Sequence, residues 1–173
     1  MNEVMKAIRA RRSTRAFTDE QLTREEMDTL LEAAVWAPSG MGKQLWHFVG
    51  IRNAEKNLEL ARAVAEADHR GPEYNFYGAP ASIIVCYKAD EMHAYLDGSA
   101  AIENILLAAT SLGLGSCWIN QLRNVCYELP VRKLLTDYGV PEDYMVIGSV
   151  ALGHIAKETP AKARREGTVT VIE

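Results

Sequence analysis

The run PASIIVCY at residues 80–87 is the feature that most constrains how this chain can fold. Its residues are apolar without alternation, which is typical of a strand buried on both faces of a sheet. Such a strand needs a covering layer on each side, and helix-like patterns both precede and follow it. The run therefore predicts a sheet enclosed by helices.

Helical periodicity recurs along the chain on both sides of this strand. The helix-like segments lie near residues 4–8, 27–35, 59–67, 93–112 and 131–138. Thr23 and Glu26 have the spacing of a capping box, Pro38 ends the helix that follows, and Asn53 can cap the next one. In the second segment the residues expected on one buried face are Met27, Leu30, Leu31, Ala34 and Val35.

Four further segments have strand character. They are WHFVGI at 46–51, SCWI at 116–119, YMVIGSVAL at 144–152 and TVTVI at 168–172. A chain of 173 residues is typical of one domain. We therefore expect a single domain over residues 1–173, with helices packed around one sheet.

Charge and hydropathy exclude several classes of function. The formal net charge is −4 and the sequence pI is about 5.6, whereas nucleic-acid binding normally needs a basic face. No apolar run approaches the roughly 20 residues needed to span a bilayer. The arginine pair near the N-terminus is followed by STRAFTDEQLTREE, which lacks the apolar stretch of a signal. We expect a cytoplasmic protein that binds neither nucleic acid nor membrane.

Cysteine and histidine patterns do not predict a metal or nucleophilic site. The three cysteines have no CxxC spacing, and Cys86 lies within the apolar run. His93 and Asp97 share the i,i+4 spacing of a helical metal pair, but no third ligand accompanies them. Ser39 and His47 have no visible third partner, so a hydrolase is not predicted.

Two basic clusters stand out in this acidic chain. RARRSTRAF at residues 9–17 carries four arginines and a serine, and PAKARREG near the C-terminus adds Lys162, Arg164 and Arg165. Guanidinium groups and a serine hydroxyl match phosphate oxygens, so the two clusters together predict one phosphate site. The Walker A loop is absent, and LGLGS at 112–116 lacks the third glycine of a dinucleotide fingerprint.

Five ordered segments of the chain resemble the FMN-dependent nitroreductases. They are RRSTRAF, APSGMGKQLWHF, FYGAPASIIVCY, AAIENILLAATSLGLGSCWI and VALGHIAKETPAKAR. The resemblance implies an α+β fold with a mixed sheet flanked by helices, and an intertwined homodimer that binds FMN at the subunit interface. It also implies that the flavin phosphate is held by Arg11, Arg12, Ser13, Arg15, Lys162 and Arg164.

Two other matching segments correspond to the family's contacts with the flavin ring. The first resembles the loop under the isoalloxazine ring, and its matched residues are Pro38, Ser39, Gly40, Gly42 and Gln44. Gly42 stands where the family has an asparagine that contacts the ring, and Leu45 replaces a proline. The second resembles the segment beside flavin N5 and comprises Trp118, Ile119, Asn120 and Gln121, with the Gln121 backbone amide expected nearest to N5.

The resemblance implies an NAD(P)H-dependent FMN oxidoreductase with no catalytic side chain, because the flavin carries the chemistry. Hydride would pass from NADH or NADPH through flavin N5 to a nitroaromatic, a quinone or a similar flat acceptor. A catalytically idle flavin-binding or storage protein is the alternative, which the absence of a side chain at Gly42 would permit. The physiological acceptor, the choice between NADH and NADPH, and the pathway are open at this point.

Overall fold

One four-stranded sheet organises the computed structural model, which describes residues 1–173. Its strands are β1 (Trp46–Ile51), β2 (Ala81–Lys88), β3 (Gly115–Ile119) and β4 (Tyr144–Gly153), in the order β1-β2-β4-β3. All three strand pairs are antiparallel, and an isolated bridge between Ser13 and Ser116 is parallel. The predicted α+β fold is confirmed.

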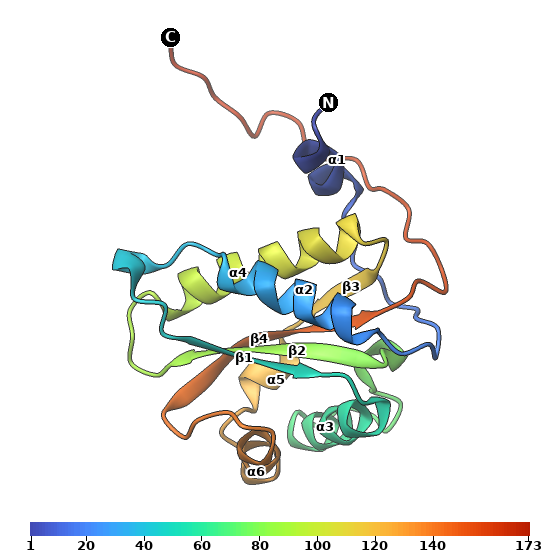
Figure 1. Cartoon of the computed structure of the whole chain (residues 1–173), viewed down its shortest axis with the longest axis vertical. Coiled ribbons are helices and arrows are strands. Elements are labelled where there is room, and N and C mark those ends of the chain that lie inside the picture. The colour runs from blue at the N-terminus through green and yellow to red at the C-terminus, as the bar shows by residue number, and fades with distance from the viewer.

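Helices cover both faces of the sheet (Figure 1). The helices on one face are α2 (Arg24–Val35) and α4 (Ala94–Ser111), and those on the other are α3 (Ala54–Ala67), α5 (Gln121–Asn124) and α6 (Leu129–Asp137). The remaining helix, α1 (Glu3–Ala10), lies outside these layers, beyond α4. Two short 3-10 turns, η1 (Gly40–Gly42) and η2 (Phe76–Gly78), lie in the connections.

Strand β2 is buried on both faces, as its apolar run predicts. Ile83 and Val85 belong to the core on the α2 and α4 side, whereas Ile84 and Cys86 belong to the core on the α3 and α6 side. All four are fully buried. Burial of each large aliphatic side chain stabilises the fold by about 1.5–3 kcal/mol, so this strand contributes to the stability of both cores.

The predicted helix starts are confirmed by their caps. The Thr23 hydroxyl accepts the Glu26 amide at 3.1 Å, and the Glu26 carboxylate accepts the Thr23 amide at 2.7 Å. The Asn53 side chain likewise accepts the Lys56 amide at 2.9 Å. Each cap satisfies an amide that has no partner inside its helix, which explains why these short motifs predict the start of a helix so well.

Two sequence predictions on exposed segments were wrong. Residues 168–172 form no strand, because no other strand pairs with them, and Val169, Val171 and Ile172 are exposed. Val35 was expected on a buried face but is 52% exposed at the last residue of α2. No helix of the chain has both the length and the hydropathy required to cross a membrane.

Candidate functional site

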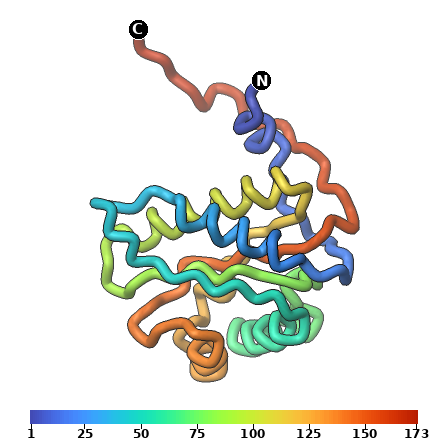
Figure 2. Tube along the Cα trace, viewed as in Figure 1, coloured from blue at the N-terminus to red at the C-terminus, as the bar shows by residue number.

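Residues from the two ends of the chain line one basic pocket of about 210 Å³. The loop after α1 and the segment after β4 run along the same edge of the molecule (Figure 2). The lining residues are Arg11, Arg12, Ser13, Arg15, Thr159, Pro160, Lys162 and Arg164. The structure thus brings together all six residues predicted to hold a phosphate. Thr159 and Pro160 were not predicted, because neither carries a charge.

Backbone pairing holds the two ends together. Ser13 is bridged to Ser116 of β3, and Phe17 is bridged to Ile155 just beyond β4. The Thr159 hydroxyl adds a hydrogen bond to the carbonyl oxygen of Ser13 at 3.2 Å. Because β3 and β4 are neighbours in the sheet, these contacts fix the arginine loop and the C-terminal segment on one rigid support.

The pocket carries five cationic side chains and no carboxylate among its lining residues. Arg11 is the only one of them in an ion pair, with 3.8 Å between its Nε and a carboxylate oxygen of Glu103. The Arg12 guanidinium donates to the carbonyl oxygens of Arg9 and Arg11, at 2.7 Å each. Cations crowded together with so little compensation favour an anion, and a phosphate accepts several such donors at once.

The pocket adjoins a hollow with aromatic walls. The Arg15 guanidinium lies over the Tyr77 ring, 5.6 Å from its centroid. Tyr77 also lines a hollow of about 390 Å³, together with Arg70, Gly71, Glu73, Tyr74 and Asn75. The Tyr74 hydroxyl donates to the Gln121 side-chain oxygen at 3.1 Å, so the predicted segment 118–121 reaches this hollow.

The hollow shows residues that the sequence interpretation missed. Its aromatic residues come from the segment YNFY at 74–77, in the connection between α3 and β2. Aromatic residues concentrated in a connecting loop were the available signal, because binding residues occur disproportionately on loops. The Arg15 contact with Tyr77 links the two cavities into one surface.

The predicted ring-contact loop at 38–44 does not lie at this pocket. It follows the opposite end of α2 (Figure 1), and the twelve residues of that helix extend about 18 Å. Met41, Gly42 and Gln44 have positive φ angles of 54°, 66° and 52°. Within a single copy of the chain, the predicted ring-contact loop therefore lies away from the phosphate pocket.

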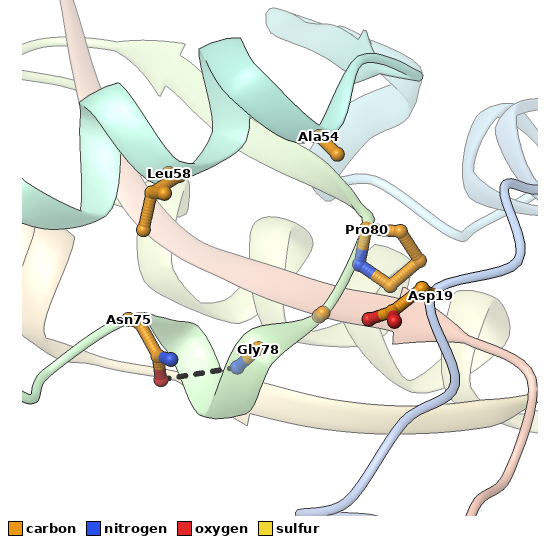
Figure 3. Close-up of a pocket in the computed structure, with 7 residues that line it drawn as sticks. Asp19, Ala54, Leu58, Asn75, Gly78 and Pro80 are labelled. Atoms are coloured by element: carbon orange, nitrogen blue, oxygen red, sulfur yellow. Dashed lines mark hydrogen bonds between the residues drawn. The ribbon is translucent and has the colours of Figure 1, made fainter.

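A third cavity, of about 190 Å³, has no comparable chemistry (Figure 3). It is lined by Asp19, Ala54, Leu58, Asn75, Gly78, Ala79 and Pro80. The Asn75 side chain accepts the Gly78 amide at 3.0 Å and closes the η2 turn. Asp19 is its only charged residue, so this cavity offers no cation to an anionic ligand.

Reactive side chains do not form a nucleophilic or metal site. The three cysteines are buried and unbridged, and burial raises the pKa of Cys86 to about 12, which keeps it a neutral thiol. Burial also raises the pKa of Cys117, although the nearby Arg15 and Arg11 oppose this shift. No group of three or more His, Cys, Asp or Glu side chains could hold a metal ion.

Comparisons with known proteins agree with this arrangement. A sequence model described as the nitroreductase family matches residues 8–154. A solved nitroreductase with bound FMN from Bacteroides fragilis shares 38% identity over 100% of both chains, with a TM-score of 0.93. A second with bound FMN, from Desulfitobacterium hafniense, shares 31% identity over 100% of both chains, with a TM-score of 0.89.

A curated relative extends the comparison to a named activity. An NADPH-flavin oxidoreductase from Vibrio harveyi is 32% identical over an alignment of 183 residues, gaps included. The alignment covers 100% of this chain and 74% of the relative. The family match covers most of the chain, from the last turn of α1 to the end of β4, and so includes the arginine loop and the whole sheet. The chain belongs to the nitroreductase family.

Proposed function

We propose that this protein is an FMN-dependent NAD(P)H oxidoreductase that holds the flavin phosphate in the basic pocket. The observation that carries the proposal is the pocket itself: five cations and a serine hydroxyl, with no carboxylate among the lining residues. Relatives with bound FMN and a relative named as an NADPH-flavin oxidoreductase support the same conclusion.

Each part of the site has its own task in this proposal. Arg11, Arg12, Ser13 and Arg15 bind the phosphate from one side, and Lys162 and Arg164 bind it from the other. The bound flavin supplies the two-electron chemistry, accepting hydride from NADH or NADPH and passing it to an acceptor. The chain therefore needs no general acid or nucleophile of its own, which agrees with its buried cysteines.

The Gln121 amide is proposed to face the reactive edge of the flavin. Gln121 is the first residue of α5, and the first amides of a helix have no acceptor inside it. The Tyr74 hydroxyl bonds the Gln121 side chain and so turns it toward the hollow wall. This contact supports a fixed position for the Gln121 backbone amide. A hydrogen-bond donor stabilises a reacting atom best when its position is fixed in advance.

We propose that two copies form an intertwined dimer and complete each other's flavin sites. A second copy could place its 38–44 loop beside the first copy's pocket, which a single chain does not do. Apolar residues exposed at the end of α2 and in the C-terminal segment provide contact surface, including Trp36, Val169 and Ile172. Replacing Val169, Val171 and Ile172 by serine should shift the protein toward monomer in analytical ultracentrifugation, and an unchanged dimer would exclude the segment from the interface.

The acceptor is proposed to be a nitroaromatic, a quinone or another flat molecule. Only residues 89–93 connect β2 to α4, and Glu91 of this connection pairs with Lys43, so little chain is available to cover a flavin bound beside the 38–44 loop of a second copy. An open site favours flat acceptors that stack on the ring over acceptors recognised by enclosing contacts. Steady-state rates with a quinone and a nitroaromatic, measured against a bulky aliphatic disulfide, test this preference.

Flavin storage without turnover is the second candidate, and Gly42 is the observation that favours it. Gly42 has no side chain to contact the ring, and apart from its chain neighbours no residue lies within 4 Å of the place where a Cβ would be. A visible absorption spectrum of the protein with FMN, before and after anaerobic NADH or NADPH, separates the two candidates. Bleaching supports the oxidoreductase, bound but oxidised flavin supports storage, and no flavin binding contradicts both.

A further inference from the structure

The His93–Asp97 pair at the start of α4 encloses the backbone of Gly40. Asp97 is only 5% exposed, and both of its carboxylate oxygens lie 3.0 Å from the Gly40 amide nitrogen. Tyr87 lies on β2, and its hydroxyl donates to the same carboxylate at 2.7 Å. A buried carboxylate is costly unless its lone pairs are used, and here two donors use them.

Gly40 fits this place because it has no side chain. A Cβ there would lie 2.5 Å from Cδ2 of the His93 ring and 2.7 Å from Cγ. The ring therefore covers one side of Gly40, while Asp97 binds its amide. The i,i+4 spacing that resembles a metal pair instead forms a clamp of His93 and Asp97 around one glycine.

The segment beyond Gly40 is also held by its own turn, in which the Gly42 amide donates to the Ser39 carbonyl oxygen at 3.0 Å and the Lys43 amide donates to the Gly40 carbonyl oxygen at 3.2 Å. Met41 is 77% exposed, and Met41, Gly42 and Gln44 all have positive φ angles. Such angles are strained for the non-glycine residues Met41 and Gln44 and persist only where other contacts enforce them. Two further contacts are the Lys43–Glu91 ion pair at 2.9 Å and the Ser39 hydroxyl, which accepts the Gln44 amide at 3.2 Å.

The clamp is the only one of these contacts that is anchored in the core. Asp97 and Tyr87 are buried, whereas the Lys43 side chain is 36% exposed and the Glu91 side chain 16% exposed. A partly exposed ion pair contributes less than a buried charged hydrogen bond, because breaking the buried bond leaves both partners without water or another partner. Asp97 is therefore the fully packed side chain that ties the 38–44 loop to the core.

We infer that Asp97 is a positioning residue for flavin binding, which it serves by fixing the 38–44 loop through the Gly40 amide. The inference rests on the proposed function, in which this loop contacts the flavin ring. In this inference Asp97 acts through the Gly40 amide and not through a contact of its own with the flavin. Tyr87 holds the carboxylate in the orientation that receives the Gly40 amide.

The test compares three variants with the unmodified protein. Asp97→Ala removes the acceptor, Asp97→Asn restores one oxygen to the Gly40 amide, and Tyr87→Phe removes only the second donor. Leu135→Ala is the matched control, because Leu135 is fully buried in the core on the opposite face of the sheet. It lowers stability without changing any contact of the loop.

Three properties are measured for each protein: hydrogen exchange of the amides in residues 39–44 before FMN is added, the FMN dissociation constant, and the visible spectrum of the bound flavin. Asp97→Ala should speed exchange in this segment at least tenfold, weaken FMN binding at least tenfold and shift the visible flavin spectrum. Asp97→Asn should recover most of these effects, and Tyr87→Phe should give smaller changes in the same direction. Leu135→Ala should leave all three properties near those of the unmodified protein.

The outcomes separate this inference from the proposed function. Absence of FMN binding by the unmodified protein contradicts the proposed function and removes the inference with it. Normal FMN binding by the unmodified protein, with Asp97→Ala unchanged or no weaker than Leu135→Ala, overturns the inference alone. If Asp97→Ala does not fold, Tyr87→Phe decides: unchanged loop exchange and FMN affinity in that variant overturn the role of the clamp.

Discussion

Replacing Arg11 by alanine tests the phosphate pocket most directly. The Arg11 side chain is 23% exposed and its one carboxylate neighbour, Glu103, lies 3.8 Å away and is half-exposed. Losing such a pair costs about 0–1 kcal/mol, so the fold should survive. A hydrogen bond to a charged group contributes about 1.5–3 kcal/mol. At 1.4 kcal/mol for each factor of ten, the FMN dissociation constant should rise roughly 10- to 150-fold.

Riboflavin makes this experiment specific to the phosphate. It has the same ring system and ribityl chain as FMN but no phosphate group, so Arg11→Ala should leave riboflavin affinity unchanged. Both dissociation constants can be measured by quenching of flavin fluorescence. Arg9→Ala is the matched control, because Arg9 belongs to the same arginine run and is exposed but does not line the pocket.

Two results would contradict the assignment of Arg11. One is an equal loss of FMN and riboflavin affinity, which would place Arg11 near the ring or make its effect structural. The other is an equal loss of FMN affinity in Arg9→Ala and Arg11→Ala, which would indicate a diffuse effect of positive charge. A diffuse effect would also disappear at raised salt for both variants, because exposed charges are screened within about 10 Å at 0.1 M.

Three further outcomes follow from other contacts. Arg164→Ala should weaken FMN binding whereas its neighbour Arg165→Ala should not, because only Arg164 lines the pocket; titration with FMN distinguishes them. Burial raises the pKa of Tyr87 to about 12, so as pH rises the Tyr87 hydroxyl loses its proton in the unfolded chain before it does so in the folded protein. The free energy of unfolding should fall by up to about 3 kcal/mol between pH 10 and 12, and urea titrations of Tyr87→Phe should lack this part of the decline. Gly98→Ala should destabilise the fold by about 1–3 kcal/mol in urea, because its Cβ would lie 2.7 Å from the Ile147 side chain; a gain in stability would contradict this crowding.

The parts of the fold that the sequence predicts well are those set by neighbours along the chain. The strand WHFVGI occupies residues 46–51 as expected, and the caps at Thr23 and Asn53 begin α2 and α3. The caps depend on contacts within a few residues, and the strand pattern of 46–51 is realised because β2 pairs with it. The C-terminal TVTVI has an equally good strand pattern, but a strand also needs a neighbouring strand, and none lies beside it within one chain. Local pattern specifies conformation only where a partner is available.

The candidate site divides along the same line. Charge alone grouped Arg11 with Lys162, and the structure brings them together through backbone bridges such as Phe17–Ile155 that no charge pattern indicates. Tyr77 was missed because its contact with Arg15 joins residues 62 positions apart, and no sequence pattern pairs the aromatic loop with the arginine loop. His93 and Asp97 were noticed for their spacing, but in the structure Asp97 accepts the Gly40 backbone amide and the His93 ring packs beside Gly40.

Gly42 shows what a single departure from a family pattern changes and what it leaves intact. Its φ of 66° lies in the left-handed region, where glycine is favoured and asparagine is the most tolerated of the residues with side chains. The asparagine expected by resemblance and the glycine present here therefore suit the same backbone conformation. The substitution should preserve the loop and remove only a side-chain amide.

Open space around Gly42 means that Gly42→Asn could restore that amide without displacing a neighbour. If the loop contacts the flavin ring, this variant should shift the visible spectrum and the reduction potential of the bound FMN. The ratio of the FMN and riboflavin dissociation constants should stay unchanged, because the phosphate is held elsewhere.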